Sequence, residues 1–286
     1  MYAITGITGQ VGGAMARTLL QAGKPVRAVV RDAAKARAFA AQGCEIALAD
    51  MNDARALAEA FHGAEGVFIL PPPNFDPSPG FPEAREGAAC VRQALEQARP
   101  GKVIHLSTIG AQATSSNLLS QQGIYEHTLA DLSLPLTVLR PGWFMENFRW
   151  DVDAARNDGI LYSFLQPLGR AILMVATDDI GRVAAELIQE NWQGRRVVEL
   201  QGPEQTSPDD AAAAFSRVLG KQVRAQAVPR ETWGALFKGQ GMNDPMPRIQ
   251  MLDGFNEGWI CFEGPAENIR KGRITLEHVL RELTAS

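Results

Sequence analysis

The sequence predicts an α/β fold, with a doubly wound parallel sheet and a smaller C-terminal α/β lobe. Three observations predict it. Short apolar segments alternate with amphipathic helical segments through the first half of the chain. Glycines 6, 9 and 12 follow the first apolar segment with the spacing G-x-x-G-x-x-G. The 286 residues are 45% hydrophobic and 21% charged, which is the composition of a globular protein with one large or two small domains.

The first unit of this pattern lies within residues 2–31 and predicts a dinucleotide-binding, Rossmann-type unit. YAIT is the strand, a helix runs to Gly23 and PVRAVVR is the second strand. Gly6 permits a tight turn, Gly9 lets the backbone approach a pyrophosphate, and Gly12 lets the helix pack closely on the sheet. The helix N-terminus then favours the phosphate charge. The alternative is a glycine turn that binds no ligand.

The same alternation continues to about residue 142. Further strands are expected at 44–50, 66–70 and 102–108, with one more accompanying LPLTVLRPG. Helical patterns separate them, which gives a right-handed parallel sheet. Residues 71–82 contain six prolines, so we expect an irregular loop that leaves the carboxyl edge of the sheet and frames the cofactor.

The end of the second strand indicates which cofactor is bound. An acidic residue there would hydrogen-bond the ribose 2′-hydroxyl of NAD, whereas an arginine accommodates the 2′-phosphate of NADP. Arg31 directly follows AVV, and Lys35 one turn later adds positive charge. We therefore expect NADP(H), with NAD(H) as the less favoured cofactor. The alternative is a solvated Arg31–Asp32 pair in which Asp32 caps the next helix.

We expect residues 1–145, with 176–203 returning to them, to form the dinucleotide domain, and 146–175 with 204–286 the smaller lobe. Ser207 before Pro208 predicts a helix start. Two later helices, in 231–241 and 247–258, are expected to close over the substrate. Their apolar stripes are more typical of a core than of a pocket; they comprise Trp233, Phe237, Met242, Met246, Met251 and Phe255.

Composition argues against several classes of protein. The net charge is −4 without a long basic run, which disfavours nucleic acid as a partner. No apolar run has the roughly 18 residues of a membrane span, and the N-terminus lacks a secretory pattern. The three cysteines and four histidines show no metal-ligand spacing, so no metal is expected. These features predict a cytoplasmic protein that acts on a small molecule.

Several segments in order resemble the NmrA-like family, a branch of the atypical short-chain dehydrogenases. The segments are TGITGQVGG, VVRD, ALADMND, HLSTIGA, EHTLADLSLPLTVLRPGWFMEN (126–147), VATDDIGRVAAELI and VVELQGPE. The resemblance covers roughly the first 205 residues, and TLEHVLREL near the C-terminus is similar too. It implies a Rossmann domain with a small lobe, an NADP preference and, in some members, reduction of quinones or related acceptors. Other members act as redox-responsive regulators.

The resemblance also implies which residues line the cofactor. They are Gly6, Thr8, Gly9, Gln10, Val11, Arg31, Asp50, Met51, Leu70, Pro71, Thr108 and Gln122. We add neighbours from the same edge to this expected set, namely Lys35, Pro72, Ser107, Pro141, Gly142 and Trp143. Gln122 stands where many relatives carry Lys or His, and it offers no positive charge and no titratable proton.

The catalytic Tyr and Lys of ordinary short-chain dehydrogenases, four residues apart, are missing here. Leu129 stands four residues after Tyr125, and no lysine occurs between Lys102 and Lys221. A general acid contributes roughly 10² to 10⁴ in rate, which matters most for an unactivated ketone. A quinone needs it less, because its reduction gives a delocalised phenolate that solvent can protonate. The sequence therefore favours quinone-like acceptors, and we assign no catalytic residue.

Other residues could contact the substrate. Tyr125 is one candidate, although packing under a loop is favoured by its helical offset from Gln122. Ser107 and Thr108 could donate hydrogen bonds to the substrate or the carboxamide, or could satisfy local backbone. Trp143, Phe144 and Met145 follow the strand that ends at Pro141 and suit a planar, apolar acceptor, or they bury the junction between the lobes.

Two functions of different class follow from this. The first is an NADPH-dependent oxidoreductase that transfers hydride to a quinone-like or other conjugated acceptor. The alternative is an NADP(H)-binding redox sensor without turnover, which would act through a protein partner. The aromatic residues at Trp143 favour the enzyme, because a sensor needs only the dinucleotide groove. An isomerase or reductase of an aromatic metabolite is related chemistry and stays open.

Overall fold

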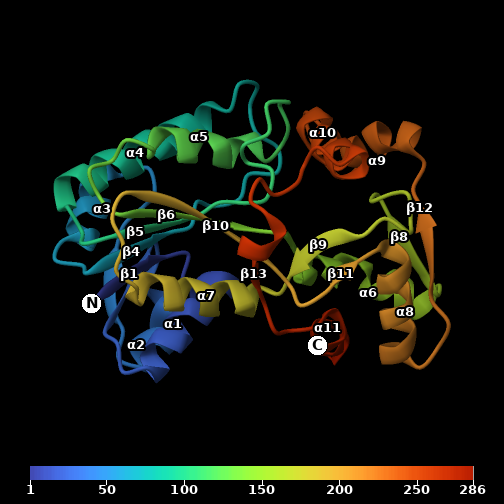
Figure 1. The fold of residues 1–286 in the computed structure, drawn as a ribbon, viewed down its shortest axis with the longest axis horizontal. Helices are drawn as coiled ribbons and strands as arrows, with labels where there is room; N and C mark the ends of the chain where they lie inside the picture. Colours follow the sequence, from blue (N-terminus) through green and yellow to red (C-terminus); the bar gives the residue numbers. More distant parts are fainter. Residues whose placement is uncertain (286) are drawn as a thin grey trace.

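A computed structural model describes residues 1–285. Its centre is an eight-stranded sheet of order β13-β10-β6-β5-β4-β1-β2-β3 (Figure 1). Every pair of neighbouring strands in this sheet is parallel, as predicted. The strands are β1 (Tyr2–Thr5), β2 (Val26–Val30), β3 (Glu45–Leu48), β4 (Gly66–Ile69), β5 (Val103–Leu106), β6 (Leu136–Pro141), β10 (Arg195–Gln201) and β13 (Arg270–Lys271).

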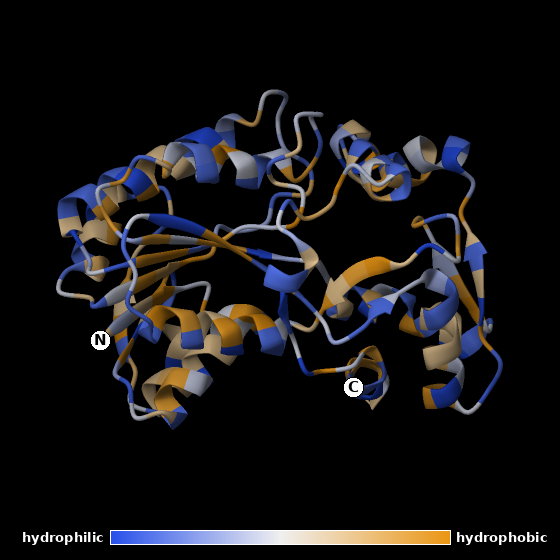
Figure 2. Cartoon of the chain, in the orientation of Figure 1, coloured by the Kyte–Doolittle hydropathy of each residue, from blue (hydrophilic) through white to orange (hydrophobic). Residues whose placement is uncertain are grey.

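Helices cover both faces of this sheet, which is the doubly wound arrangement (Figure 1). One face carries α1 (Gln10–Gln21) and α7 (Thr177–Gln189), and the other carries α3 (Ala54–Phe61), α4 (Pro82–Ala98) and α5 (Ser120–Thr128). Side chains alternate between the two faces along each strand: Tyr2 and Ile4 join the first core, and Ala3 joins the second. The apolar faces of α1 and α7 turn inward (Figure 2).

Local sequence signals set the helix boundaries. Gly23 has φ +68°, a conformation that glycine adopts at low cost, and α1 ends just before it. After β2, the Asp32 carboxylate accepts the Ala34 N–H and caps a short 3-10 helix, η1 (Ala33–Ala36), which continues into α2 (Arg37–Ala40). The predicted helix start at Ser207 is confirmed by a complete capping box with Asp210.

The smaller lobe has its own core. Its strands form a three-stranded sheet of β7 (Trp143–Phe144), β9 (Ile172–Val175) and β11 (Gln205–Thr206), and a parallel pair of β8 (Ile160–Ser163) and β12 (Arg224–Ala227). Around them lie η2 (Met145–Asp151), α6 (Val152–Asn157), α8 (Pro208–Leu219), η3 (Arg230–Thr232), α9 (Trp233–Gly239), α10 (Met246–Glu257), η4 (Ala266–Asn268) and α11 (Leu276–Ala285).

The predicted apolar stripes of this lobe mostly enter its core. Trp233 and Phe237 are fully buried, and Met251 and Phe255 are buried beside them. Met246 differs, since 47% of its surface is exposed at the first turn of α10. The segment 204–286 also departs from its expected place at one point: β13 leaves the lobe and pairs with β10 at the edge of the large sheet. Among residues 1–285, no helix is long and apolar enough to cross a membrane.

A histidine without hydrogen-bond partners lies at the centre of the large sheet. His105 on β5 is fully buried, and its ring stacks on that of Tyr125 with 5.5 Å between centroids. Neither ring nitrogen of His105 has a hydrogen-bond partner. Burial lowers the pKa of His105 from 6.5 to about 4, against the attraction of the Glu126 carboxylate. His105 is therefore neutral at pH 7.

This buried histidine predicts a loss of stability in mild acid. Between pH 6.5 and about 4 the unfolded chain binds a proton that the folded protein does not, so the free energy of unfolding falls as the pH falls. The loss reaches about 3 kcal/mol across that window. Urea titrations at pH 7 and pH 4.5 should show a smaller difference for His105→Leu than for the parent protein. Replacing the exposed His62 with Gln should leave the difference unchanged.

Candidate functional site

The glycine turn after β1 leaves the start of α1 open. The Gly9 N–H donates to the Gly6 carbonyl at 3.0 Å, and no side chain caps the helix. A methyl group at Gly12 would lie 2.3 Å from the Gly6 oxygen, so only glycine fits there. Thr8, Gly9 and Gln10 are exposed. The free N–H groups of the first turn can therefore receive a phosphate.

A buried threonine holds the neighbouring strand end against this turn. Thr5 Oγ1 donates to the Phe68 carbonyl at 3.2 Å and accepts the Leu70 N–H at 2.8 Å. The Leu70 side chain packs against Gly6, whose φ of +66° needs glycine. The structure therefore brings Leu70, and Pro71 after it, beside the glycine turn at the carboxyl edge of the sheet, while the next residue, Pro72, is exposed.

The second and third strands end in charged residues at the same edge. Arg31 and Lys35 are exposed, and within the described chain neither makes an ion pair or a side-chain hydrogen bond. Asp32 caps η1 instead of pairing with Arg31. Asp50 accepts the Asn52 N–H at 2.9 Å, and Met51 is partly buried. Both cations are free to bind an anionic group of a ligand.

Gln122 on α5 has an unsatisfied buried acceptor. Its Oε1 atom is buried without a hydrogen-bond partner, although the residue as a whole is only partly buried. A hydroxyl donor such as that of a ribose would satisfy this atom. The open α1 N-terminus, the free Arg31 and this amide oxygen all fit a dinucleotide with an additional phosphate.

A buried ion pair involves Glu126, one helical turn after Gln122 on α5. The Arg140 guanidinium on β6 binds both carboxylate oxygens of Glu126 on α5, at 2.6 and 2.8 Å, and only 3% of Arg140 is exposed. Ser107 Oγ donates to the same carboxylate at 2.5 Å. Burial opposes ionisation of Glu126, but the hydrogen bonds from Arg140 and Ser107 outweigh it and hold its pKa below the ordinary value. Arg140 also pairs with Glu263 of the C-terminal segment.

This network changes the roles expected for two candidates. Ser107 has one hydroxyl proton and gives it to Glu126, so it is not a free donor for a substrate. Thr108, the next residue, is partly buried. The Glu126–Arg140 pair was not predicted from the sequence. One indication of it was present there, the charged Arg140 within the apolar strand LTVLRP. The partner of Arg140 could not be predicted, because the pairing depends on tertiary structure.

The turn after β6 joins the two lobes. Pro141 and Gly142 are buried, and Met145 lies in the core of the smaller lobe with 1% exposure. Trp143 and Phe144 are partly buried, and the Trp143 ring meets Phe255 of α10 edge-on at 5.1 Å. The aromatic residues therefore bury the junction, as one alternative predicted. Both residues follow the carboxyl end of β6, and contact with the substrate stays a prediction for them.

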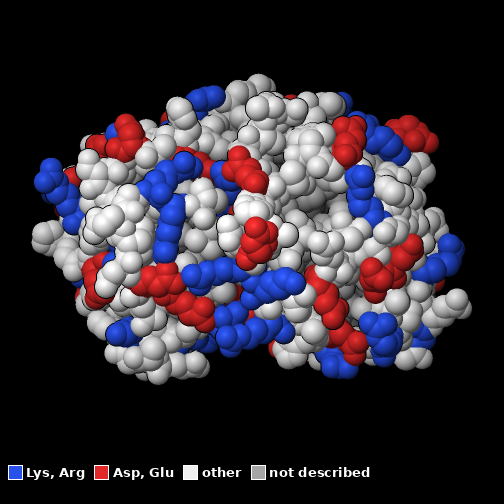
Figure 3. All heavy atoms as spheres, viewed as in Figure 1, with Lys and Arg blue, Asp and Glu red and all other residues white. Residues whose placement is uncertain are grey.

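The proline-rich loop reaches across to the smaller lobe. The Asp76 carboxylate accepts the backbone N–H groups of Asn243 and Asp244 at 2.9 and 3.0 Å, and these bonds lower the pKa of Asp76. The Leu118 N–H donates to the Pro247 carbonyl at 2.9 Å. Between the lobes the surface is hollowed, and most of the residues around this recess are uncharged (Figure 3).

A separate cavity lies within the smaller lobe. Its volume is about 510 Å³, and it is bordered by α9, by the first half of α10 and by the loop between them. None of the residues expected to bind the cofactor lines it. This cavity is therefore not part of the site at the carboxyl edge.

Tyr125 lies in the core rather than at the recess. Only 5% of it is exposed, it stacks on His105, and its hydroxyl approaches Gly87 of α4. Burial raises the pKa of Tyr125 to about 12. This position favours the packing role over substrate contact.

An open glycine turn at a helix N-terminus, with a free arginine at the next strand end, defines a dinucleotide-binding protein of the Rossmann type. The model of the NmrA-like family matches residues 2–253, and the chain belongs to that family.

Several characterised proteins are similar to this chain. Quinone oxidoreductase 2 of Escherichia coli K12 is 30% identical, over 85% of this chain and 83% of that protein. The NAD(P)H azoreductase of Xenophilus azovorans is 28% identical, over 90% and 85%. The crystal structure of the E. coli NADPH-dependent quinone oxidoreductase in complex with NADPH superposes with a TM-score of 0.82, 27% identity and 99% coverage of both chains. The fold of Citrobacter sp. triphenylmethane reductase is also similar, with a TM-score of 0.81 at 21% identity and 99% coverage of both chains.

The placement of Tyr125 gives a direct test of its role. Tyr125→Phe should change the rate of NADPH oxidation by less than about threefold, because a residue in the core donates no proton to substrate. A general acid would cost roughly 10² to 10⁴ in rate when removed. Steady-state assays decide between the two, and a hundredfold loss in a variant with unchanged thermal stability would show that Tyr125 takes part in the reaction.

Proposed function

We propose that this protein is an NADPH-dependent oxidoreductase that transfers hydride to a quinone-like or other conjugated small-molecule acceptor. One observation carries the proposal: the partly buried Trp143 and Phe144 follow the end of β6, at the sheet edge that also carries the open glycine turn. Ligands of open parallel sheets bind at this edge. A partly apolar recess there suits a flat acceptor beside a nicotinamide.

Residues of the chain suit three groups of the cofactor. The N–H groups at the start of α1 would bind the pyrophosphate, Arg31 the 2′-phosphate, and the unpartnered Gln122 Oε1 a ribose hydroxyl. The bound cofactor supplies the hydride, and the protein supplies position, electrostatics and exclusion of water. The similarity to a quinone oxidoreductase solved with NADPH supports the same assignment.

Three candidate residues of the site supply no acid, which favours one substrate class. Tyr125 is in the core, Ser107 gives its proton to Glu126, and Gln122 has no titratable proton. A quinone that accepts a hydride becomes a hydroquinone monoanion, which solvent protonates without help. A simple ketone would become a strongly basic alkoxide and would need a general acid. The site therefore supports quinones and other conjugated acceptors over ketones.

A redox sensor would need fewer structural features than this protein has. Binding NADP(H) without turnover uses only the glycine turn and the strand ends. The aromatic turn at Trp143 and the recess between the lobes have no role in that function. These features support the enzyme.

NADPH oxidation by the purified protein across quinones, aldehydes and ketones tests the proposal. We expect turnover with quinones and a rate at least about 100-fold lower with unactivated ketones, because no general acid is available. Comparable rates with ketones would contradict the acid-free mechanism. Binding of NADPH without turnover of any acceptor would favour the redox sensor.

Arg31 should determine the choice between the two nicotinamide cofactors. Arg31→Ala should raise KM for NADPH by about 10-fold to 100-fold, the effect of losing a charge-assisted contact, and change KM for NADH by less than about threefold. Arg37→Ala is the matched control, because Arg37 is exposed on α2 nearby. If Arg31→Ala leaves the NADPH to NADH ratio unchanged, another residue recognises the 2′-phosphate.

A further inference from the structure

Arg248, on α10, is a half-buried cation without a counter-ion. Among the described residues it makes no ion pair and no hydrogen bond, and its guanidinium carbon lies 4.2 Å from the centre of the Phe237 ring. Each of the other buried or half-buried arginines binds a carboxylate or a carbonyl. These are Arg27, Arg92, Arg140, Arg170, Arg182, Arg196 and Arg270. Among these partly or fully buried arginines of the described chain, Arg248 is the one without a carboxylate or carbonyl partner.

Removing a cation from water without a partner is unfavourable. Burial lowers the pKa of Arg248, because the charged form loses part of its hydration. The aromatic contact with the fully buried Phe237 offsets part of it. The contact with the ring provides no hydrogen-bond acceptor, so the five N–H donors of the guanidinium have none in the described chain.

Arg248 lies on the same face of α10 as Phe255. Arg248, Met251 and Phe255 share one face, since they are spaced by three and seven residues. Phe255 touches Trp143 at the carboxyl edge of the large sheet. The carbonyl of Pro247 binds the N–H of Leu118, four residues before Gln122. Arg248 therefore lies on the side of α10 that contacts the aromatic turn, next in the chain to the residue that contacts the segment before α5.

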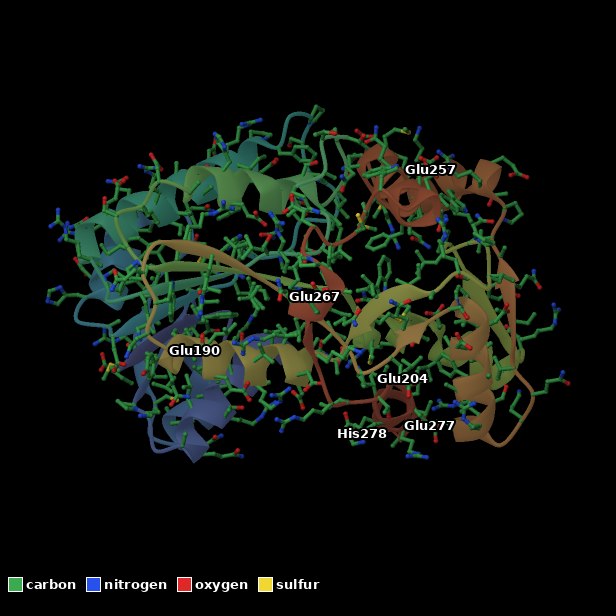
Figure 4. The ribbon with its side chains drawn as sticks, in the orientation of Figure 1. Glu190, Glu204, Glu257, Glu267, Glu277 and His278 are labelled. Atoms are coloured by element: carbon green, nitrogen blue, oxygen red, sulfur yellow. The ribbon has the colours of Figure 1, made fainter. Side chains whose placement is uncertain are left out.

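The acidic groups closest in sequence have other partners. Asp253 binds Arg230 through both oxygens at 2.7 Å, and Glu257, at the far end of α10 (Figure 4), accepts the indole N–H of Trp259 at 3.0 Å. Asp244 accepts the Met246 N–H at 3.0 Å. None of these carboxylates neutralises Arg248.

We propose that Arg248 binds an anionic substituent of the acceptor, a carboxylate, sulfonate or phosphate, while the planar part of the acceptor lies against Trp143. This inference rests on the proposed reductase function and names its substrate class. The guanidinium fork matches two oxygens of such a group. The apolar surroundings from Phe237 strengthen the attraction. An uncharged quinone leaves the cation unsatisfied and therefore binds less tightly.

A matched pair of acceptors tests the proposal: 1,2-naphthoquinone and 1,2-naphthoquinone-4-sulfonate. The measurement is kcat/KM for each with NADPH, in the parent protein, Arg248→Gln and Arg248→Lys. The ratio of sulfonate to neutral quinone should fall by about 10-fold to 100-fold in Arg248→Gln, mainly through KM, and recover in part in Arg248→Lys. Arg224→Gln, at an exposed position of the same lobe, should leave the ratio unchanged.

The outcomes separate this inference from the proposed function. If the neutral quinone is reduced and the ratio is the same in Arg248→Gln, the role of Arg248 is overturned and the reductase function stands. Equal losses for both quinones, with a lower thermal midpoint, would show that Arg248 only supports the structure. If neither quinone is reduced, calorimetric binding of naphthalene-2-sulfonate decides: tenfold weaker binding by Arg248→Gln supports the anion site, and equal binding overturns it.

Discussion

The buried pair of Glu126 and Arg140 is the interaction on which the geometry of the site depends. It joins α5, which carries Gln122, to β6, which continues into the aromatic turn at Trp143. Ser107 at the end of β5 and Glu263 from the C-terminal segment bind the same two side chains. Charges at such depth are stable only when both are present, because either one alone is desolvated without compensation. The pair therefore fixes the position of α5 relative to β6.

The two ends of the site differ in their electrostatics. At the ends of β1 and β2, free N–H groups and the exposed Arg31 and Lys35 provide positive potential, and neither side chain has a partner among residues 1–285. At the end of β6 the surface is aromatic and mostly uncharged. In the proposed function, different forces would hold the phosphates at the first end and a planar ring at the second, and the parallel sheet sets the distance between the two ends.

Local signals in the sequence predicted the large sheet and most of its helices. The glycine spacing, the capping residues Asp32 and Ser207, and the alternation of apolar segments each act within a few residues. The ion pair of Glu126 and Arg140, the contact of Asp76 with Asn243, and the addition of β13 to the sheet join residues far apart in the chain. Sequence spacing carries no information on such partners. For the same reason the anion site proposed at Arg248 was not predicted, because its lack of a partner is visible only once its surroundings are known.

The pairing of β13 with β10 affects how the protein unfolds. The chain leaves the large sheet after β6, returns with α7 and β10, leaves again, and returns with β13. Neither lobe is a continuous piece of polypeptide, so neither can be cut out as a fragment that retains all its strands. Loss of packing in the smaller lobe also frees the segments that complete the sheet. Denaturation should therefore be a single cooperative transition rather than two independent ones.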